Sequence, residues 1–111
     1  MLQSVNRDNF QKEVLESSQL VFVNFWINWS EVCRAMRLLM KELDNQLNEN
    51  RKLVEIDWES EKELAQKYEV YGVPSLLIFH QGQLVGRYSG MLDVEEFLDR
   101  MGGRQTPKPL V

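Results

Sequence analysis

The stretch that decides the fold is NFWINWSEVCRAM, from Asn24 to Met36. It joins the end of a hydrophobic run to the beginning of a helical pattern, and it contains Cys33, the only cysteine of the chain. A redox pair would need a second thiol three residues before Cys33, where the sequence has Ser30. The stretch therefore leaves two alternatives: a redox site that lacks one thiol, or a site that never carried redox chemistry.

The residues on either side of Ser30 predict a strand followed by a long helix. LVFVNFW (20–26) is dense in β-branched and aromatic residues, which is typical of a buried strand. The stretch NEN (48–50) is expected to end the helix. Within the helix, apolar residues repeat at intervals of three and four, as on a buried face; they are Met36, Leu39, Met40, Leu43 and Leu47.

Helical and strand patterns alternate before and after this unit. Apolar spacing predicts a helix within residues 4–17 and another within 60–68. The second helix would begin with a capping box formed by Ser60 and Glu63. KLVEI (52–56) is typical of a strand that lies between the long helix and the helix within 60–68.

The last part of the chain predicts a β-hairpin and one more helix. LLIFHQGQLVGRYSG (76–90) has the pattern of two strands around a turn that contains Gly82. DVEEFLDRM (93–101) is amphipathic, with Asp93 as its cap. Because a βαβ start requires parallel strands and a hairpin adds antiparallel ones, we predict an α/β fold. Its central mixed sheet would have four or five strands, flanked by four helices.

One domain is expected to account for the chain. It has 111 residues, of which 43% are hydrophobic and 27% charged, and these values are ordinary for a globular protein with one core. We see no internal repeat and no second domain. The predicted domain covers residues 1–103, and residues 104–111 form a tail rich in proline that we expect to be loose.

Charge and composition exclude several classes of function. The net charge of −4 argues against a nucleic-acid partner, because phosphate binding needs a basic face. The longest apolar run, 20–27, is interrupted by Asn24 and is too short to span a membrane. One cysteine and one histidine cannot build a metal site of their own, so we expect neither a metal nor another cofactor. A single cysteine also fits a reducing compartment, and we expect a cytoplasmic protein.

The chain resembles the thioredoxin family over nearly its whole length. In that family a strand leads to Trp-Cys-Gly-Pro-Cys and a long helix, followed by a cis-proline turn, a hairpin and a glycine before the last helix. The resemblance implies a thioredoxin fold and a thiol–disulfide oxidoreductase that serves electron transport and redox homeostasis. The corresponding stretches, in the same order, are NFWINWSEVCR (24–34), YGVPSLLIF (71–79), HQGQ (80–83) and YSGML (88–92).

Several positions depart from the family pattern. Ser30 stands where the family has its nucleophilic cysteine, and Cys33 stands where it has the resolving cysteine. Asn24 stands at the position of a buried aspartate that handles protons for the resolving thiol. Glu31 and Val32 replace the Gly-Pro pair between the two cysteines. These departures affect the residues on which thiol exchange depends.

The departures predict weak or absent thiol chemistry. A serine hydroxyl forms no disulfide, and Ser30 is suited instead to cap the helix. The helix N-terminus favours a thiolate at Cys33, whereas burial favours the protonated thiol. A count back from Pro74 places Glu55 beside Asn24, and a negative charge there would also favour the protonated thiol. We expect a protonated, slowly reacting Cys33. Because Asn24 does not ionise, the proton relay of the family is missing.

The resemblance also implies a groove for protein segments. Pro74 matches the cis-proline of the family, and the backbone of the preceding Val73 would pair with an extended segment. The alternative, without a binding function, is that Val73 and Met91 only pack the loops. The full set of residues expected around Ser30 is Trp29, Glu31, Val32, Val73, Pro74, Gly90 and Met91.

Two classes of function remain open. The first is a redox-inactive binding module that holds protein or peptide segments in an apolar groove. The second is an enzyme, which would either act as a monothiol through Cys33 or be a Cys-to-Ser variant of a W-C-E-V-C thioredoxin. In that second class, glutathione or a thioredoxin reductase would be the redox partner.

Overall fold

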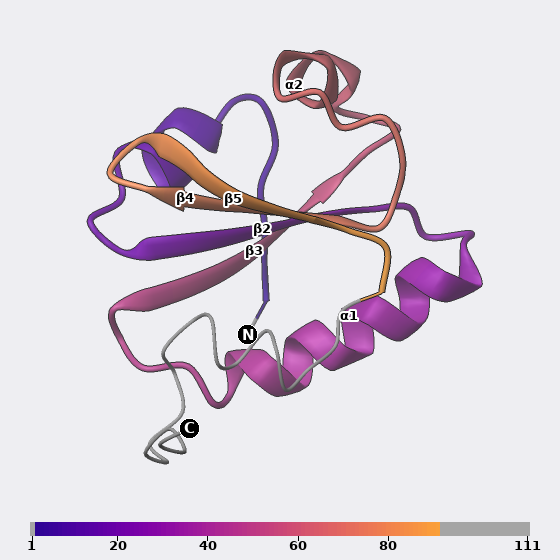
Figure 1. Ribbon diagram of the computed structural model, residues 1–111, viewed down its shortest axis with the longest axis horizontal. Helices are drawn as coiled ribbons and strands as arrows, with labels where there is room; N and C mark the ends of the chain where they lie inside the picture. The colour runs from indigo at the N-terminus through magenta and orange to yellow at the C-terminus, as the bar shows by residue number, and fades with distance from the viewer. Residues whose placement is uncertain (1, 92–111) are drawn as a thin grey trace, which may run out of the picture.

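Five strands form one mixed sheet in the computed structural model of the chain, which describes residues 2–91 (Figure 1). The strand order across the sheet is β1-β3-β2-β4-β5. β1, β3 and β2 run parallel, whereas β4 and β5 are antiparallel to their neighbours. This confirms the predicted α/β fold with a closing hairpin. The strands are β1 (Gln3–Ser4), β2 (Leu20–Trp26), β3 (Arg51–Asp57), β4 (Ser75–His80) and β5 (Gln83–Ser89).

Helices cover both faces of the sheet. α1 (Glu31–Asp44) lies on one face, and α2 (Lys62–Lys67) lies on the other together with η1 (Gln11–Leu15), a short π-helix (Figure 1). The predicted helix at 93–101, the domain end at 103 and the tail 104–111 lie outside the described residues. Three of the four expected helices are therefore present in residues 2–91.

Alternation along β2 assigns its side chains to the two faces. Val23 and Phe25 belong to the core beneath η1 and α2, whereas Phe22 packs with Met36 and Met40 of α1. The five residues 21–25, with Asn24 among them, are all fully buried. A strand covered on both faces has a nearly continuous apolar sequence, which explains the run at 20–26.

Two boundaries differ from the prediction. α1 ends at Asp44 instead of reaching 48–50, yet Leu47 still packs against the core beneath α1. The expected capping box at Ser60 and Glu63 is wrong. The side chain of Asp57 accepts the N–H groups of Glu59 and Ser60 instead, which forms a turn before α2 begins.

The hairpin of β4 and β5 brings together two segments of the predicted groove. Its turn has positive φ angles at Gln81 (51°) and Gly82 (80°), as a two-residue turn between right-twisted strands requires. At the far end of the hairpin, the N–H of Gly90 donates to the carbonyl oxygen of Pro74 over 2.9 Å. The hairpin therefore fixes the loop before β4 next to the loop after β5.

Candidate functional site

The loops that hold most of the predicted site lie at one end of the sheet. Phe25, near the carboxyl end of β2, is opposite Ser75 at the start of β4, which is opposite Ser89 at the end of β5. α1 begins at the same end, which is at the right in Figure 1. His80 pairs with Leu20 at the opposite end of β2. The only histidine is therefore far along the strand from Ser30, which excludes a serine–histidine pair.

Ser30 is the N-cap of α1, as predicted. Its backbone is extended (φ −93°, ψ 125°), and its Oγ accepts the N–H of Cys33 over 3.2 Å. The carbonyl oxygen of Ser30 accepts the N–H of Arg34 over 2.9 Å, which is the first bond of the helix. The hydroxyl thus satisfies one of the backbone donors that a helix start leaves free.

The thiol of Cys33 has no access to solvent. Cys33 is 0% exposed, whereas the preceding Val32 is 48% exposed. Thiol exchange needs a thiolate that can approach a disulfide sulfur in line. The thiol of Cys33 is therefore buried, and the more accessible Ser30, which is half-buried, has no thiol.

Asn24 and Glu55 are neighbours beneath α1. They are opposite each other in the parallel pairing of β2 with β3, as the count back from Pro74 predicts. Asn24 is 0% exposed, and neither polar atom of its side chain has a hydrogen-bond partner among the described residues. A buried amide without partners costs about 1–3 kcal/mol for each unsatisfied group. The side chain of Asn24 is therefore polar but carries no charge.

The carboxylate of Glu55 forms an ion pair with Arg37 of α1. The Nε and Nη2 atoms of Arg37 each donate to one carboxylate oxygen over 2.8 Å, and Glu55 is 3% exposed. The guanidinium carbon also lies 4.4 Å from the ring centroid of Trp26. The expectation of a protonated Cys33 included the negative charge of Glu55 but not the positive charge of Arg37 that is paired with it.

Sequence reasoning missed Arg37, although one signal was present. Arg37 lies four residues after Cys33 and next to Met36, on the side of α1 that packs on the sheet. A charged residue that is partly buried beside an apolar helix face favours a partner of opposite charge. Without the strand register, that partner was not identifiable.

The turn at Pro74 carries the second part of the site. The Val73–Pro74 peptide bond is cis, Pro74 is buried, and Val73 is half-buried. Within residues 2–91, no hydrogen bond uses the backbone N–H or C=O of Val73. Gly90 reaches the same turn through its bond to the carbonyl oxygen of Pro74. The backbone of Val73 is therefore available to an extended segment.

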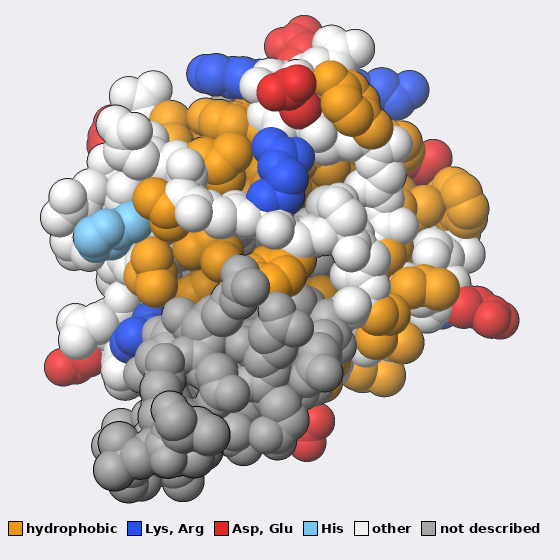
Figure 2. Space-filling model, viewed as in Figure 1, with side chains coloured by type: hydrophobic (Ala, Val, Ile, Leu, Met, Phe, Trp, Pro, Cys, Tyr) orange, Lys and Arg blue, Asp and Glu red, His pale blue; other side chains and the backbone are white. Residues whose placement is uncertain are grey.

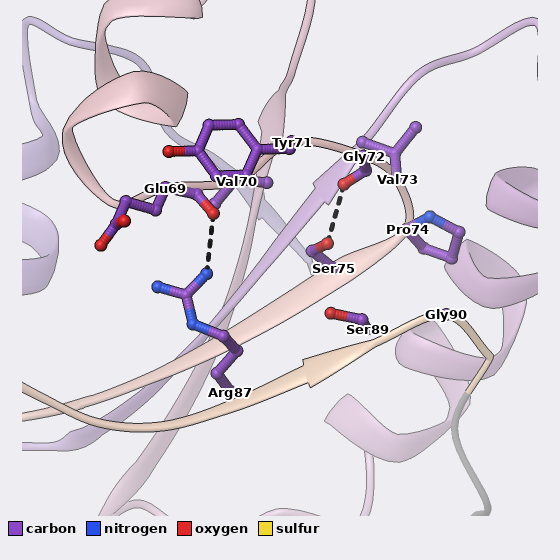
Figure 3. A pocket seen from close by; sticks show the side chains of 10 residues that line it. All are labelled: Glu69, Val70, Tyr71, Gly72, Val73, Pro74, Ser75, Arg87, Ser89 and Gly90. Carbon is purple, nitrogen blue, oxygen red and sulfur yellow. Dashed lines mark hydrogen bonds between the residues drawn. The ribbon is translucent and has the colours of Figure 1, made fainter.

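A pocket of about 310 Å³ lies beside this turn (Figure 3). Arg87 of β5 crosses it and donates to the backbone carbonyl oxygens of Tyr68 and Glu69. The hydroxyl of Ser75 donates to the carbonyl oxygen of Gly72 over 2.7 Å. The lining residues are Glu69, Val70, Tyr71, Gly72, Val73, Pro74, Ser75, Arg87, Ser89 and Gly90.

The pocket contains only part of the predicted groove. It includes Val73, Pro74 and Gly90, but not the other predicted binding residues, Trp29, Glu31, Val32 and Met91. Trp29 is 65% exposed and Met91 is 51% exposed. These two side chains are on the open surface at the same end of the sheet.

Trp29 has a defined orientation despite its exposure. Its indole N–H donates to the Oε1 of Glu59 over 2.9 Å. This bond joins the loop before α1 to the loop after β3. Sequence reasoning did not single out Glu59 as a partner of Trp29, because the two residues are 30 positions apart.

Residues 2–91 contain no group of three metal-binding side chains. None of the helices in this part has the length and hydrophobicity needed to span a lipid bilayer.

Comparison with known proteins gives a consistent family. A family model described as Thioredoxin matches residues 1–102. Thioredoxin C-2 of Corynebacterium nephridii is 35% identical over 83 residues, which cover 75% of this chain and 77% of that protein. Thioredoxin 1 of Synechococcus elongatus is 33% identical over 87 residues, covering 78% and 81%. Thioredoxin of Buchnera aphidicola (Schizaphis graminum) is 31% identical over 94 residues, covering 82% and 87%.

The capping role of Ser30 predicts how substitutions of this residue change the stability of the fold. Ser30→Ala removes the acceptor for the N–H of Cys33 and should lower the free energy of unfolding by about 1 kcal/mol. Ser30→Asp keeps an acceptor and places a negative charge at the helix N-terminus, so it should remain close to wild type. Urea unfolding followed by circular dichroism measures both. Equal stability of the two variants would contradict a capping role.

The Arg37–Glu55 pair predicts a larger effect. Arg37→Met leaves a buried carboxylate without its partner, which costs about 3–5 kcal/mol for a fully buried pair. The side chain of Arg37 is 35% exposed, so water compensates in part, and we expect a loss of about 2 kcal/mol.

Two further variants make the test of this pair specific. Adding Glu55→Met to Arg37→Met should restore most of the lost stability, because no unpaired charge then remains. Lys41→Met removes an exposed cation from the same helix and should change little. Urea midpoints that are the same for Arg37→Met and Lys41→Met would show that the pair does not stabilise the fold.

Proposed function

The chain belongs to the thioredoxin family, and from this premise we propose that it is a redox-inactive member that binds protein segments around Ser30 and Pro74. The observation that carries the proposal is the exchange of roles at the start of α1. The position that would attack a disulfide is half-buried and holds a capping hydroxyl, and the only thiol of the chain, on Cys33, is fully buried. A serine cannot form the mixed disulfide with which exchange begins.

The binding half of the proposal rests on the turn at Pro74. The unused backbone groups of Val73 are suited to pair with an extended segment, as in β-strand addition. The exposed Trp29 and Met91 at the same end of the sheet offer apolar contacts to the side chains of that segment. A protein or peptide in extended conformation is therefore the ligand class that we assign to this surface.

The enzymatic alternative has less support. A monothiol reaction with glutathione would require Cys33 to reach solvent, but its side chain is on the buried side of α1. The amide of Asn24 adds no base, because it does not ionise. We also propose that the protein works in the cytoplasm, where a lone thiol stays reduced.

The proposal predicts the outcome of a disulfide-reduction assay. The wild-type chain should not reduce insulin disulfides above background with dithiothreitol or with thioredoxin reductase and NADPH as donor. Ser30→Cys adds a thiol on the turn before Cys33, so this variant should form an internal disulfide and show measurable turnover. Turnover by the wild-type chain would contradict the proposal and assign the chemistry to Cys33.

The binding role predicts a loss of affinity in Trp29→Ala. Peptides selected from a random display library on the immobilised wild-type chain should bind this variant about tenfold or more weakly, because exposed tryptophans are frequent anchors of interfaces. Stability should change little, since the side chain is 65% exposed. Affinities follow from fluorescence anisotropy of the labelled peptides.

Leu38→Ala is the matched control for the binding test. Leu38 is 68% exposed on α1, so the variant removes a comparable apolar surface from elsewhere on the molecule. It should bind the selected peptides like the wild type. If Trp29→Ala and Leu38→Ala bind them equally well, the surface around Ser30 and Pro74 is not the binding site.

A further inference from the structure

The surface around Trp29 combines apolar side chains with carboxylates. We define the Trp29 surface as Trp29, Val32 and Met91 together with the acidic Glu31 and Glu59. Resting on the proposed function, we propose that this surface selects segments in which lysine or arginine flanks an apolar residue. The proposal names the chemistry of the partner, which the proposed function leaves open.

The apolar part of the Trp29 surface is large for side chains in contact with water. Trp29, Val32 and Met91 are 65%, 48% and 51% exposed. Figure 2 shows hydrophobic side chains gathered along the right-hand edge of the molecule, where Figure 1 places the start of α1 and the end of β5. Single exposed apolar residues need no explanation, whereas a group of them is typical of a contact site.

The two carboxylates border these apolar side chains. Glu31 is the first residue of α1 and is exposed. Glu59 is exposed too and uses Oε1 to accept the indole N–H of Trp29. Neither forms a salt bridge with another residue in the range 2–91. Figure 2 shows acidic side chains above and beside the hydrophobic group on this edge.

The nearby positive charges do not cancel this acidity. The segments 28–34 and 57–60 contain the carboxylates of Glu31, Asp57 and Glu59 against the single guanidinium of Arg34. Arg34 directs its Nη1 to the carbonyl oxygen of Asn28 over 2.7 Å. The N-terminus of α1 adds about half a positive charge. The surface therefore remains negative.

A cationic side chain gains from both parts of this surface. The exposed indole face of Trp29 attracts a lysine or arginine, and Glu59 on the edge of the same ring adds an opposite charge. An apolar residue next to the cation would contact Val32 or Met91. An acidic segment would meet like charge at Glu31 and Glu59, which is unfavourable. Each exposed charge pair contributes about twofold to fivefold in affinity, so the preference arises from several pairs together.

Three labelled peptides test the proposal. They share one central leucine–valine pair, and their flanking residues are lysine in the first, glutamine in the second and glutamate in the third. Fluorescence anisotropy should give affinities in the order lysine, glutamine, glutamate, with about tenfold between the first two at low salt. The difference should shrink at about 0.5 M NaCl, where exposed charges are screened within a few ångströms.

Variants of the full chain locate the preference. Glu31→Gln and Glu59→Gln should each weaken binding of the lysine peptide about twofold to threefold and leave the glutamine peptide unchanged. Glu42→Gln is the control, because it removes an exposed carboxylate near the other end of α1 and should change neither affinity. Trp29→Ala should weaken binding of all three peptides.

The possible failures are distinguishable. Equal affinities for the three peptides that fall in Trp29→Ala would overturn the preference for cations and leave the proposed function standing. A lysine preference that Glu42→Gln reduces as much as Glu59→Gln would reflect the net charge of −4 and also overturn it. No binding of any peptide, or binding that Trp29→Ala does not change, would contradict the binding role itself.

Discussion

The ion pair between Arg37 and Glu55 fixes α1 over the sheet, and the rest of the site depends on that position. Two hydrogen bonds of 2.8 Å connect the middle of the helix to β3, the strand next to the central β2. A charge removed from water is tolerated when a partner satisfies its hydrogen bonds, and the bidentate geometry does so here. Because Cys33 lies one turn before Arg37, the pair also keeps its thiol on the buried side of the helix.

The departures from the thioredoxin pattern are consistent with one another. At position 30 the cap of the helix remains, but the nucleophile does not. At position 24 a polar side chain remains in the core, but without the ability to ionise. The carboxylate beneath α1 comes instead from the neighbouring strand, where Arg37 binds both of its oxygens. In the proposed function, each change keeps a structural element of the fold and removes a chemical group that thiol exchange needs.

Much of the fold follows from local sequence, and the exceptions share a cause. The strand at 20–26, the buried face of α1, the hairpin turn at Gly82 and the cap at Ser30 depend on residues close together in the chain. The end of α1 was not predictable, because Leu47 continues the apolar spacing and packs in the core although the helix ends at Asp44.

The long-range pairs of the site were not predictable either. The side-chain pairs of Arg37 with Glu55 and of Trp29 with Glu59 join residues 18 and 30 positions apart, and they exist only once the sheet register is set. In the proposed function the thiol of Cys33 does not react, so the chain would hold a partner by non-covalent contacts alone. A thioredoxin that exchanges disulfides gains a covalent bond to its substrate and needs little affinity beforehand. Under that proposal, selectivity would come from the backbone of Val73, the indole of Trp29 and the charges beside it. Stable interfaces bury roughly 1,600 Å² in total, far more than a few exposed side chains provide. A short segment bound at this surface would therefore dissociate rapidly.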